Sequence, residues 1–301
     1  MEEKLISVVI PVYNQIQTIE NTISSVLNQT YVNIEVIVVD DGSEIDIESV
    51  VKKMVDTRIS YYKIEHRNAN VARNYGISMS KGEYIAMLDA DDIWMPGHLA
   101  DCLTMLENSS ADGVYGSLII RNILSGEEYV HVVSEPEGNE SMVNYLLRTG
   151  YGAQTSSLFM STKSVRDILW NPELNRHQDY DFVVRFSKKY HFVVKVEPTV
   201  IYCLSFKQRN GDFDSCIKFI RENEYDIEPA VYNRYHLSMF LRALKMGVES
   251  RIIEHYRREA TYYKECLSYE QYIQICRPHS SYKKCICKLK YLYYILRIKV
   301  E

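Results

Sequence analysis

The segment Tyr84-Ile-Ala-Met-Leu-Asp-Ala-Asp-Asp92 is an apolar run that ends directly in three carboxylates. The apolar part predicts a buried strand at Tyr84–Leu88, so the tetrad Asp89-Ala90-Asp91-Asp92 lies at the mouth of that strand. Carboxylates crowded at such a place repel one another and need a compensating positive charge. A divalent cation carrying a phosphorylated ligand would supply it, because Mg²⁺ and Mn²⁺ prefer hard oxygen ligands. The alternative is an acidic helix N-terminus, in which Asp91 or Asp92 caps a helix that begins near Pro96.

Strand and helix signals alternate on both sides of this segment. The predicted strands are 7–10, 34–39, 59–64 and 84–88, and the predicted helices are 16–27, 47–55, 71–79 and 96–106. Continuous apolar strands separated by helices predict a parallel sheet covered on both faces. Ligands of such sheets bind outside the carboxyl ends of the strands. The loops Pro11-Val-Tyr-Asn14, Asp40-Asp-Gly-Ser43 and Asp89–Asp92 should therefore converge on one site.

The pattern changes after residue 110. The expected elements are a hairpin of 114–120 and 129–133 around Ser125-Gly126, a helix at 142–147, a strand at 155–160, a helix at 179–189, and strands at 192–196 and 199–204 broken at Pro198. From about Asp212 the chain is predicted to be helical and is rich in tyrosine.

Composition places the chain among globular proteins, with 46% hydrophobic and 25% charged residues. No run approaches the roughly 20 apolar residues needed to cross a bilayer, and a strand signal begins too early for a secretory signal. The seven cysteines form no CxxC pair, which favours a reducing cytosol and argues against zinc or a disulfide framework. The net charge of −5 argues against a nucleic-acid partner.

Six segments carry a resemblance to a known family. They are Ser7-Val-Val-Ile-Pro-Val-Tyr-Asn14, Val38-Val-Asp-Asp-Gly-Ser43, Ala72-Arg-Asn-Tyr-Gly76, Lys81-Gly-Glu-Tyr-Ile85, Leu88-Asp-Ala-Asp-Asp92 and Gln178-Asp-Tyr-Asp-Phe182. In this order and spacing the chain resembles the inverting glycosyltransferases of family 2. The resemblance implies an α/β GT-A fold, with a Rossmann-like, mainly parallel central sheet flanked by helices and a helical C-terminal extension. It implies a nucleotide-sugar-binding half at 1–110, an acceptor-binding half of the same domain at 111–210, and the extension at 211–301.

The resemblance also assigns a donor site. A nucleotide-diphosphate sugar, with a UDP-sugar favoured, would bind with a bridging Mn²⁺ or Mg²⁺. Asp91 is expected to be the main metal ligand, and Asp89 to lie near the ribose, the phosphate or the metal. Asp40 would meet the base, and Arg73 would counter the diphosphate charge unless it is only a surface cation of its helix. The implied donor-binding residues are Pro11, Val12, Tyr13, Asn14, Asp40, Asp41, Arg73, Asp89 and Ala90.

Inversion needs a base on the opposite side of the sugar, because the acceptor hydroxyl loses its proton as it attacks. Asp179 matches the aspartate of the family's Glu-Asp pair and is the expected base, with Asp181 as its competitor. Gln178 stands where the family usually has glutamate. The alternative for Asp179 is a carboxylate that only stabilises a helix N-terminus. Trp94, His98, Trp170 and His177 flank these motifs and are not assigned catalytic roles.

The C-terminal tail has a separate charge pattern. From Ser281 onward there are six basic residues and one acidic residue, which gives +5 and leaves −10 for the rest. A helix at 283–298 would present an apolar stripe beside lysines, which is typical of a helix lying on an anionic membrane. That helix would place the enzyme at the cytoplasmic leaflet beside a lipid-linked acceptor. The alternative is a helix packed on the body or on a second subunit.

Three functions remain open from the sequence. The first is a metal-dependent inverting glycosyltransferase of cell-surface polysaccharide or glycolipid biosynthesis, acting on a saccharide or lipid-linked saccharide acceptor. The second is a sugar nucleotidyltransferase, which should carry a glycine-rich, basic loop after the first strand, where this chain has Pro11-Val-Tyr-Asn14. The third is a catalytically silent nucleotide-sugar-binding protein.

Overall fold

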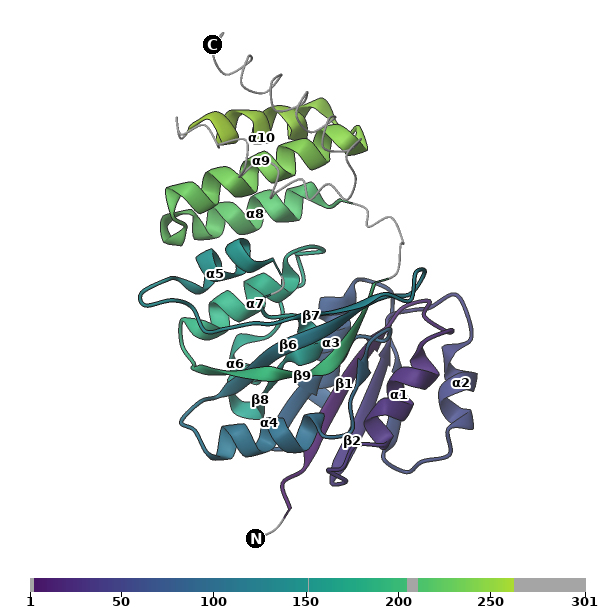
Figure 1. Ribbon diagram of the computed structural model, residues 1–301. Coiled ribbons are helices and arrows are strands. Elements are labelled where there is room, and N and C mark those ends of the chain that lie inside the picture. Colours follow the sequence, from purple (N-terminus) through teal and green to yellow (C-terminus); the bar gives the residue numbers. More distant parts are fainter. Residues whose placement is uncertain (1–2, 151, 205–210, 263–301) are drawn as a thin grey trace. The chain divides into compact units, whose positions relative to one another are not determined.

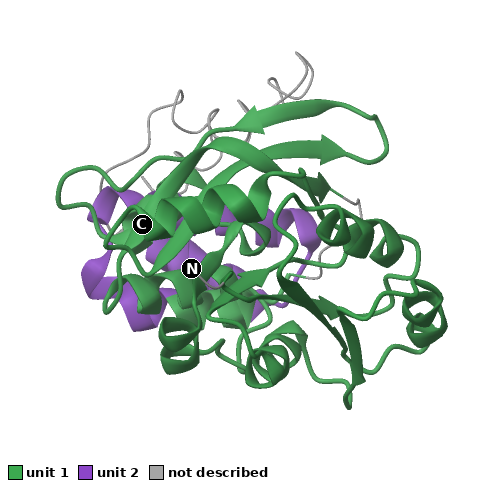
Figure 2. Ribbon diagram, turned by 90° about the horizontal axis from the view of Figure 1, so that it is seen from below, with its two compact units in different colours: residues 1–219 green, residues 220–301 purple. Residues whose placement is uncertain are grey.

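The computed structural model of the protein describes residues 3–150, 152–204 and 211–262. The chain divides into two compact units, residues 1–219 and 220–301 (Figure 2). Among the described residues, no helix combines the length and the apolar character needed to cross a membrane.

The first half of unit 1 is a parallel sheet built in the order β3-β2-β1-β4. Its strands are β1 (Ile6–Val12), β2 (Ile34–Asp40), β3 (Ile59–Lys63) and β4 (Tyr84–Met87). Every ladder among these four strands is parallel. All four predicted strands are present, and their carboxyl ends meet at one edge of the sheet, as expected from the alternation of strand and helix signals.

The sheet continues beyond β4 in the order β8-β6-β9-β5, with β7 paired to β6, for nine strands in the described part of the chain. The bounds are β5 (Ile93–Trp94), β6 (Gly113–Asn122), β7 (Glu128–His131), β8 (Phe159–Ser161) and β9 (Phe192–Leu204). β8 is antiparallel to both β4 and β6, so β6 runs in the direction of β4, and β9 is parallel to β6. The prediction of a mainly parallel central sheet is confirmed.

Helices cover both faces of this sheet (Figure 1). Their bounds are α1 (Ile19–Leu27), α2 (Ile47–Lys53), α3 (Ala69–Met79), α4 (His98–Glu107), α5 (Met142–Thr149), α6 (Thr162–Ile168) and α7 (Gln178–Ser187). Val8 and Ile10 of β1 join a buried cluster with side chains of α1 and α4. Val9 points the other way, toward α3, because successive residues of a strand face opposite sides. A Cβ on Gly76 of α3 would lie 2.4 Å from Val9 Cγ1, so glycine is what lets α3 lie this close to the sheet.

Several details differ from the sequence prediction, among them the short strand β5, which was not predicted. β9 is one strand through Pro198, and the interruption appears instead as a bulge, where residues 196–199 of β9 stand opposite Ser117 of β6. The strand predicted at 155–160 begins with a 3-10 turn at Thr155–Ser157, capped by the Gln154 side chain. Helix α6 was not predicted.

The described part of the C-terminal extension, residues 211–262, is mainly helical, as predicted. Helix α8 (Phe213–Asn223) spans the boundary between the units, and α9 (Pro229–Met246) and α10 (Ser250–Tyr262) form a helical pair in unit 2. Gly247 ends α9 in the left-handed conformation at φ 61°. His236 is buried between the two helices, and its ring lies 5.7 Å from that of Tyr256. The predicted membrane-surface helix at 283–298 lies outside the described residues.

Candidate active site

The acidic loop after β4 is held from below by two threonines of the α1 region. The Ala90 carbonyl accepts hydrogen bonds from Thr18 Oγ1 at 2.7 Å and Thr22 Oγ1 at 3.0 Å, and the Asp92 carbonyl accepts one from Thr22 Oγ1 at 2.9 Å. These bonds fix the backbone of the loop. The side chains of Asp89 and Asp91 are half-buried, which leaves part of each carboxylate exposed.

Asp92 has a different position from its two acidic neighbours. Its side chain is fully buried and accepts hydrogen bonds from Ser156 Oγ at 2.5 Å and from the backbone N–H of Cys203 at 2.9 Å. Burial raises the pKa of Asp92 well above its ordinary value, and the charges of Asp91 and Asp89 raise it further. Asp92 therefore anchors the loop to β9, and Asp89 and Asp91 are the carboxylates that remain accessible.

The second acidic loop, after β2, has both of its carboxylates engaged. Asp40 is completely buried, and its oxygens accept from the Ser43 N–H at 2.7 Å and from the Tyr61 hydroxyl at 2.6 Å. Asp41 is also buried and contacts His66 Nδ1 and the Arg67 N–H, both at 2.9 Å. A base could reach Asp40 only after Tyr61 or the Ser43 turn moved, so its predicted contact with the base stays a prediction.

The loop after β1 lies beside this second loop. The Asn14 N–H donates to Ser43 Oγ at 2.9 Å, and Asn14 Oδ1 accepts from the Glu44 N–H at 3.0 Å, with Asn14 in the left-handed region at φ 54°. Pro11 and Val12 are buried in β1, whereas Tyr13 is exposed. The Tyr13 ring stacks on His66, with ring centroids 4.1 Å apart. This stack presents an accessible aromatic face at the edge where the acidic loops gather.

Arg73 of α3 is buried and joins three parts of the site. Its Nη2 donates to Asp89 Oδ1 at 2.8 Å, and its Nη1 donates to Gln178 Oε1 at 2.8 Å and to Asn70 Oδ1 at 3.0 Å. Its guanidinium carbon lies 4.5 Å from the centre of the Trp170 ring, within cation–π range. The reading of Arg73 as a surface cation of its helix is therefore wrong.

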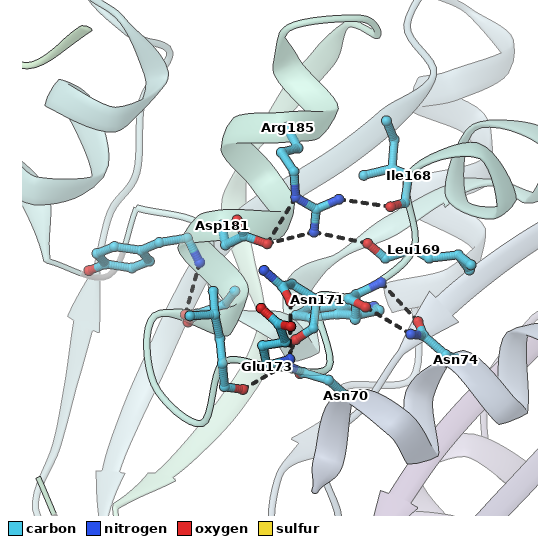
Figure 3. Close-up of polar contacts among 12 residues, drawn as sticks. Asn70, Asn74, Ile168, Leu169, Asn171, Glu173, Asp181 and Arg185 are labelled. Atoms are coloured by element: carbon cyan, nitrogen blue, oxygen red, sulfur yellow. Dashed lines mark hydrogen bonds and ion pairs between the residues drawn. The ribbon is translucent and has the colours of Figure 1, made fainter. Parts of the chain in front are cut away.

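The segment before α7 is held by side chains of both α3 and α7 (Figure 3). Asn70 donates to the carbonyls of Asn171 and Leu174 at 2.6 and 2.9 Å, and Asn74 exchanges two hydrogen bonds with the backbone of Trp170. From the other side, Arg185 donates to the carbonyls of Ile168 and Leu169 at 2.7 and 3.0 Å (Figure 3).

Leu169 and His177, at the two ends of this segment, have positive φ values of 47° and 57°. Non-glycine residues in that region are strained and persist where the surroundings over-determine them. The hydrogen bonds from α3 and α7 supply that constraint and fix the entry into α7.

The two candidate bases of α7 have opposite environments. The half-buried Asp179 accepts from the Tyr180 N–H at 3.0 Å, and no cation of the described residues forms an ion pair with it. Burial raises the pKa of Asp179, an effect that Arg73 opposes and Asp89 reinforces. Asp181 is buried and paired with Arg185 Nη2 at 2.6 Å. Asp179 is thus available to take a proton, whereas Asp181 is held in a structural ion pair.

The described residues contain no group of three or more His, Cys, Asp or Glu side chains arranged to hold a metal ion. The accessible carboxylates of Asp89 and Asp91 still fit a hard divalent cation, because Mg²⁺ uses one or two protein carboxylates together with waters and substrate phosphates. Asp89 Oδ1 is taken by Arg73, and its other oxygen accepts no hydrogen bond within the described residues.

The four flanking aromatic and histidine side chains have packing roles. Trp94 is buried with its Nε1 donating to the Ser156 carbonyl at 2.8 Å, and buried His98 contacts Thr199 Oγ1 at 2.8 Å. Trp170 is buried and stacks on Phe182, with ring centroids 4.5 Å apart, and His177 stacks on Tyr180. The prediction missed Ser156, Thr22 and His66; a buried hydroxyl or imidazole partner leaves no distinctive spacing along the chain.

Comparisons with known proteins identify the family of this chain. A family profile described as "Glycosyl transferase family 2" matches residues 7–169. The amylovoran biosynthesis glycosyltransferase AmsB of Erwinia amylovora is 32% identical over 213 residues, which cover 67% of this chain and 70% of that protein. The UDP-Glc:alpha-D-GlcNAc-diphosphoundecaprenol beta-1,3-glucosyltransferase WfgD of Escherichia coli is 37% identical over 123 residues, which cover 40% of this chain and 49% of that protein.

Solved structures support the fold. The structure of S. aureus TarS 1-349 in complex with UDP-GlcNAc has a TM-score of 0.66 at 15% identity, covering 91% of this chain and 84% of that one. An identity this low speaks for the fold alone, which is the predicted GT-A fold. The matched family, the relatives and the arrangement of the loops together lead to one assignment. The chain belongs to glycosyl transferase family 2 and is a glycosyltransferase.

Proposed function

We propose that the protein transfers a sugar from a nucleotide-diphosphate sugar to an acceptor hydroxyl, with inversion at the anomeric carbon and with the help of a divalent cation. One observation carries the proposal. Arg73 bridges Asp89 of the acidic loop to Gln178, the residue before Asp179, with both hydrogen bonds at 2.8 Å. The candidate cation-binding loop and the candidate base are therefore adjacent, as a displacement with donor and acceptor on opposite sides of one carbon requires.

In this proposal the residues have separate tasks. Tyr13 offers its exposed ring to the nucleotide base, while Asp40 and Asp41 hold the shape of the loop beside it. Asp91 and the second oxygen of Asp89 would hold Mn²⁺ or Mg²⁺, which would neutralise the charge that develops on the diphosphate leaving group. Asp179 accepts the proton of the attacking hydroxyl, since its carboxylate has no cationic partner in the described chain.

The substrate class is proposed from the relatives' names. AmsB is named for amylovoran biosynthesis, WfgD for glucosyl transfer to a diphosphoundecaprenol-linked sugar, and TarS was solved with UDP-GlcNAc. We propose a UDP-sugar donor and a saccharide or lipid-linked saccharide acceptor of a cell-surface polysaccharide or glycolipid.

We propose further that residues 281–301 bring the enzyme to the cytoplasmic face of a membrane. Deleting these residues tests this directly. Loss of the protein from the membrane fraction supports the idea, and unchanged fractionation refutes it.

The experiment for the main proposal is a thermal-shift screen of UDP-, GDP-, CMP- and dTDP-sugars with Mn²⁺, followed by transfer assays with the donor that stabilises most. A ligand that binds only the folded state raises the melting temperature by mass action. NMR of the product then gives the anomeric configuration, and retention of the donor's configuration would refute inversion. Donor binding without transfer to any acceptor would instead favour the silent binding protein.

A further inference from the structure

Three of the five N–H donors of Arg73 are engaged by protein acceptors, and the residue is almost closed to solvent. A guanidinium has five N–H donors. Both donors on Nη1 are engaged, by Asn70 Oδ1 and Gln178 Oε1, and Nη2 donates to Asp89 Oδ1. The residue is only 4% exposed, and its Nε is buried without a hydrogen-bond partner in the described residues.

The partners of Arg73 come from three separate segments. Asn70 lies one turn away on α3, Asp89 lies in the loop after β4, and Gln178 opens α7. Gln178 lies 105 residues from Arg73 in the sequence, and Asp89 lies 16 residues from it. Removing the fork of donors would release the acidic loop and the first turn of α7 from one another.

A stack of rings supports the same connection. Arg73 lies over Trp170 at 4.5 Å, and Trp170 stacks on Phe182 of α7 with centroids 4.5 Å apart and planes at 11°. Asn74, one residue beyond Arg73, holds the Trp170 backbone with two hydrogen bonds of 2.8 Å. The guanidinium is thus fixed on its face by a ring and along its edge by acceptors.

Gln178 takes part in this arrangement as an acceptor. Its amide oxygen accepts from Arg73 at 2.8 Å, and among the described residues Asp89 is the ion-pair partner of Arg73. We infer that Arg73 is a positioning residue that uses Gln178 and Asp89 to hold the base helix in register with the donor loop, and is not a ligand of the diphosphate. This inference rests on the proposed function, because it takes Asp179 as the base and Asp89 as part of the donor site.

The test compares Arg73→Lys, Gln178→Leu and Gln178→Glu in the full chain. Lysine keeps a charge that can reach Asp89 but loses the planar fork, and leucine removes the acceptor at 178. For both we expect kcat to fall about 10- to 100-fold, the effect of a misplaced reacting group, with the donor dissociation constant within about threefold of the wild type. Gln178→Glu keeps an acceptor for Arg73 and should retain most of the activity.

The inference would be overturned if the substitution weakened donor binding and left kcat unchanged. A residue that binds the diphosphate should, in Arg73→Lys, weaken donor binding strongly while kcat for the bound donor stays near the wild-type value. Arg121→Lys is the matched control, because Arg121 forms an ion pair with Glu128 in the β6–β7 hairpin and the exchange should change neither quantity.

Hydrogen exchange separates this inference from the proposed function. In Arg73→Lys without any ligand, we expect faster exchange of the amides of residues 176–182, and unchanged exchange in α1 and α2. If the wild type transfers no sugar but this faster exchange is observed, the proposed function fails and the positioning role of Arg73 stands. If the wild type transfers sugar normally and the substitution leaves the exchange of residues 176–182 unchanged, the positioning role of Arg73 is refuted.

Discussion

Asp179→Asn and Asp181→Asn should separate catalysis from stability within one turn of α7. Asp179→Asn removes the only carboxylate of α7 that is free of a cationic partner in the described chain, and loss of a general base costs about 10²- to 10⁴-fold in rate. Its effect on folding should stay below about 1 kcal/mol, because the lost attraction to the helix N-terminus is offset by removing a charge that burial disfavours.

Asp181→Asn should have the opposite effect. Asp181 is 3% exposed, and its Oδ2 accepts from Arg185 Nε at 2.9 Å and Nη2 at 2.6 Å. Exchanging a charged for a neutral acceptor lowers a hydrogen bond from about 1.5–3 to about 0.5–1.5 kcal/mol. Because Arg185 is 35% exposed, water compensates part of the loss, and we expect about 1 kcal/mol. For a unit of this size, that lowers the melting temperature by about 2–4 °C.

The two variants are compared by single-turnover transfer at saturating donor and by thermal unfolding at the same pH. Asp181→Asn should keep kcat within about threefold, since a domain with about 5–15 kcal/mol of stability stays folded after such a loss. The assignment of the base would be refuted if Asp181→Asn were inactive but as stable as the wild type, and Asp179→Asn were active.

Three further predictions concern the cation, the pH dependence and the packing of α3. Asp91→Asn, or removal of divalent cations with EDTA, should lower kcat/KM more than about 100-fold, since a cation supplies several kcal/mol of charge stabilisation. Calorimetric titration with Mn²⁺ and donor measures the loss of cation binding, and full activity in EDTA would contradict the prediction. Burial raises the pKa of Asp179 above 3.8, so the deprotonated base is lost as the pH falls through that raised value. The pH profile of kcat/KM should therefore decline on the acid side with a midpoint above 3.8, and this decline should be absent in Asp179→Asn. Gly76→Ala would place a Cβ 2.4 Å from Val9 Cγ1 and should cost about 3 kcal/mol by overpacking, as measured by urea unfolding; Gly97→Ala, whose nearest atom would be 3.6 Å away, should cost about 1 kcal/mol or less.

The parallel half of the fold could be predicted because its signals are local. Strands β1, β2 and β4 are mainly apolar runs, and each ends in or is soon followed by a turn or acidic residue that the sequence displays directly. The rule that parallel strands share a carboxyl edge then brings together three loops that are far apart in the chain. The pairing of those loops through Asn14 and Ser43 follows from the same geometry.

The different roles of the aspartates could not be predicted, because residue type alone does not distinguish them. Asp92 is an anchor and Asp91 a candidate ligand, although they are neighbours. The difference comes from Ser156 and Cys203, which lie 64 and 111 residues away and meet Asp92 only in the folded chain. Pro198 led to the wrong prediction of two separate strands for a similar reason, since the bulge that accommodates the proline within β9 depends on pairing with β6.

The predicted division at residue 110 separates a donor half from an acceptor half, but one face of α3, in the donor half, contacts residues of the acceptor half. Asn70, Arg73 and Asn74 stand at spacings of three and four, which place them on one side of a helix. Their partners Leu174, Gln178 and Trp170 lie 104, 105 and 96 residues further along the chain.

A buried polar face on a helix that packs against an apolar sheet is costly unless every group is paired. That cost explains why the partners are mostly backbone carbonyls, which are present whatever the side chains of the acceptor half. Side chains that select an acceptor could therefore change while the base stays in place. The donor half holds the backbone of the segment that leads into α7, and it holds α7 itself through the side-chain oxygen of Gln178.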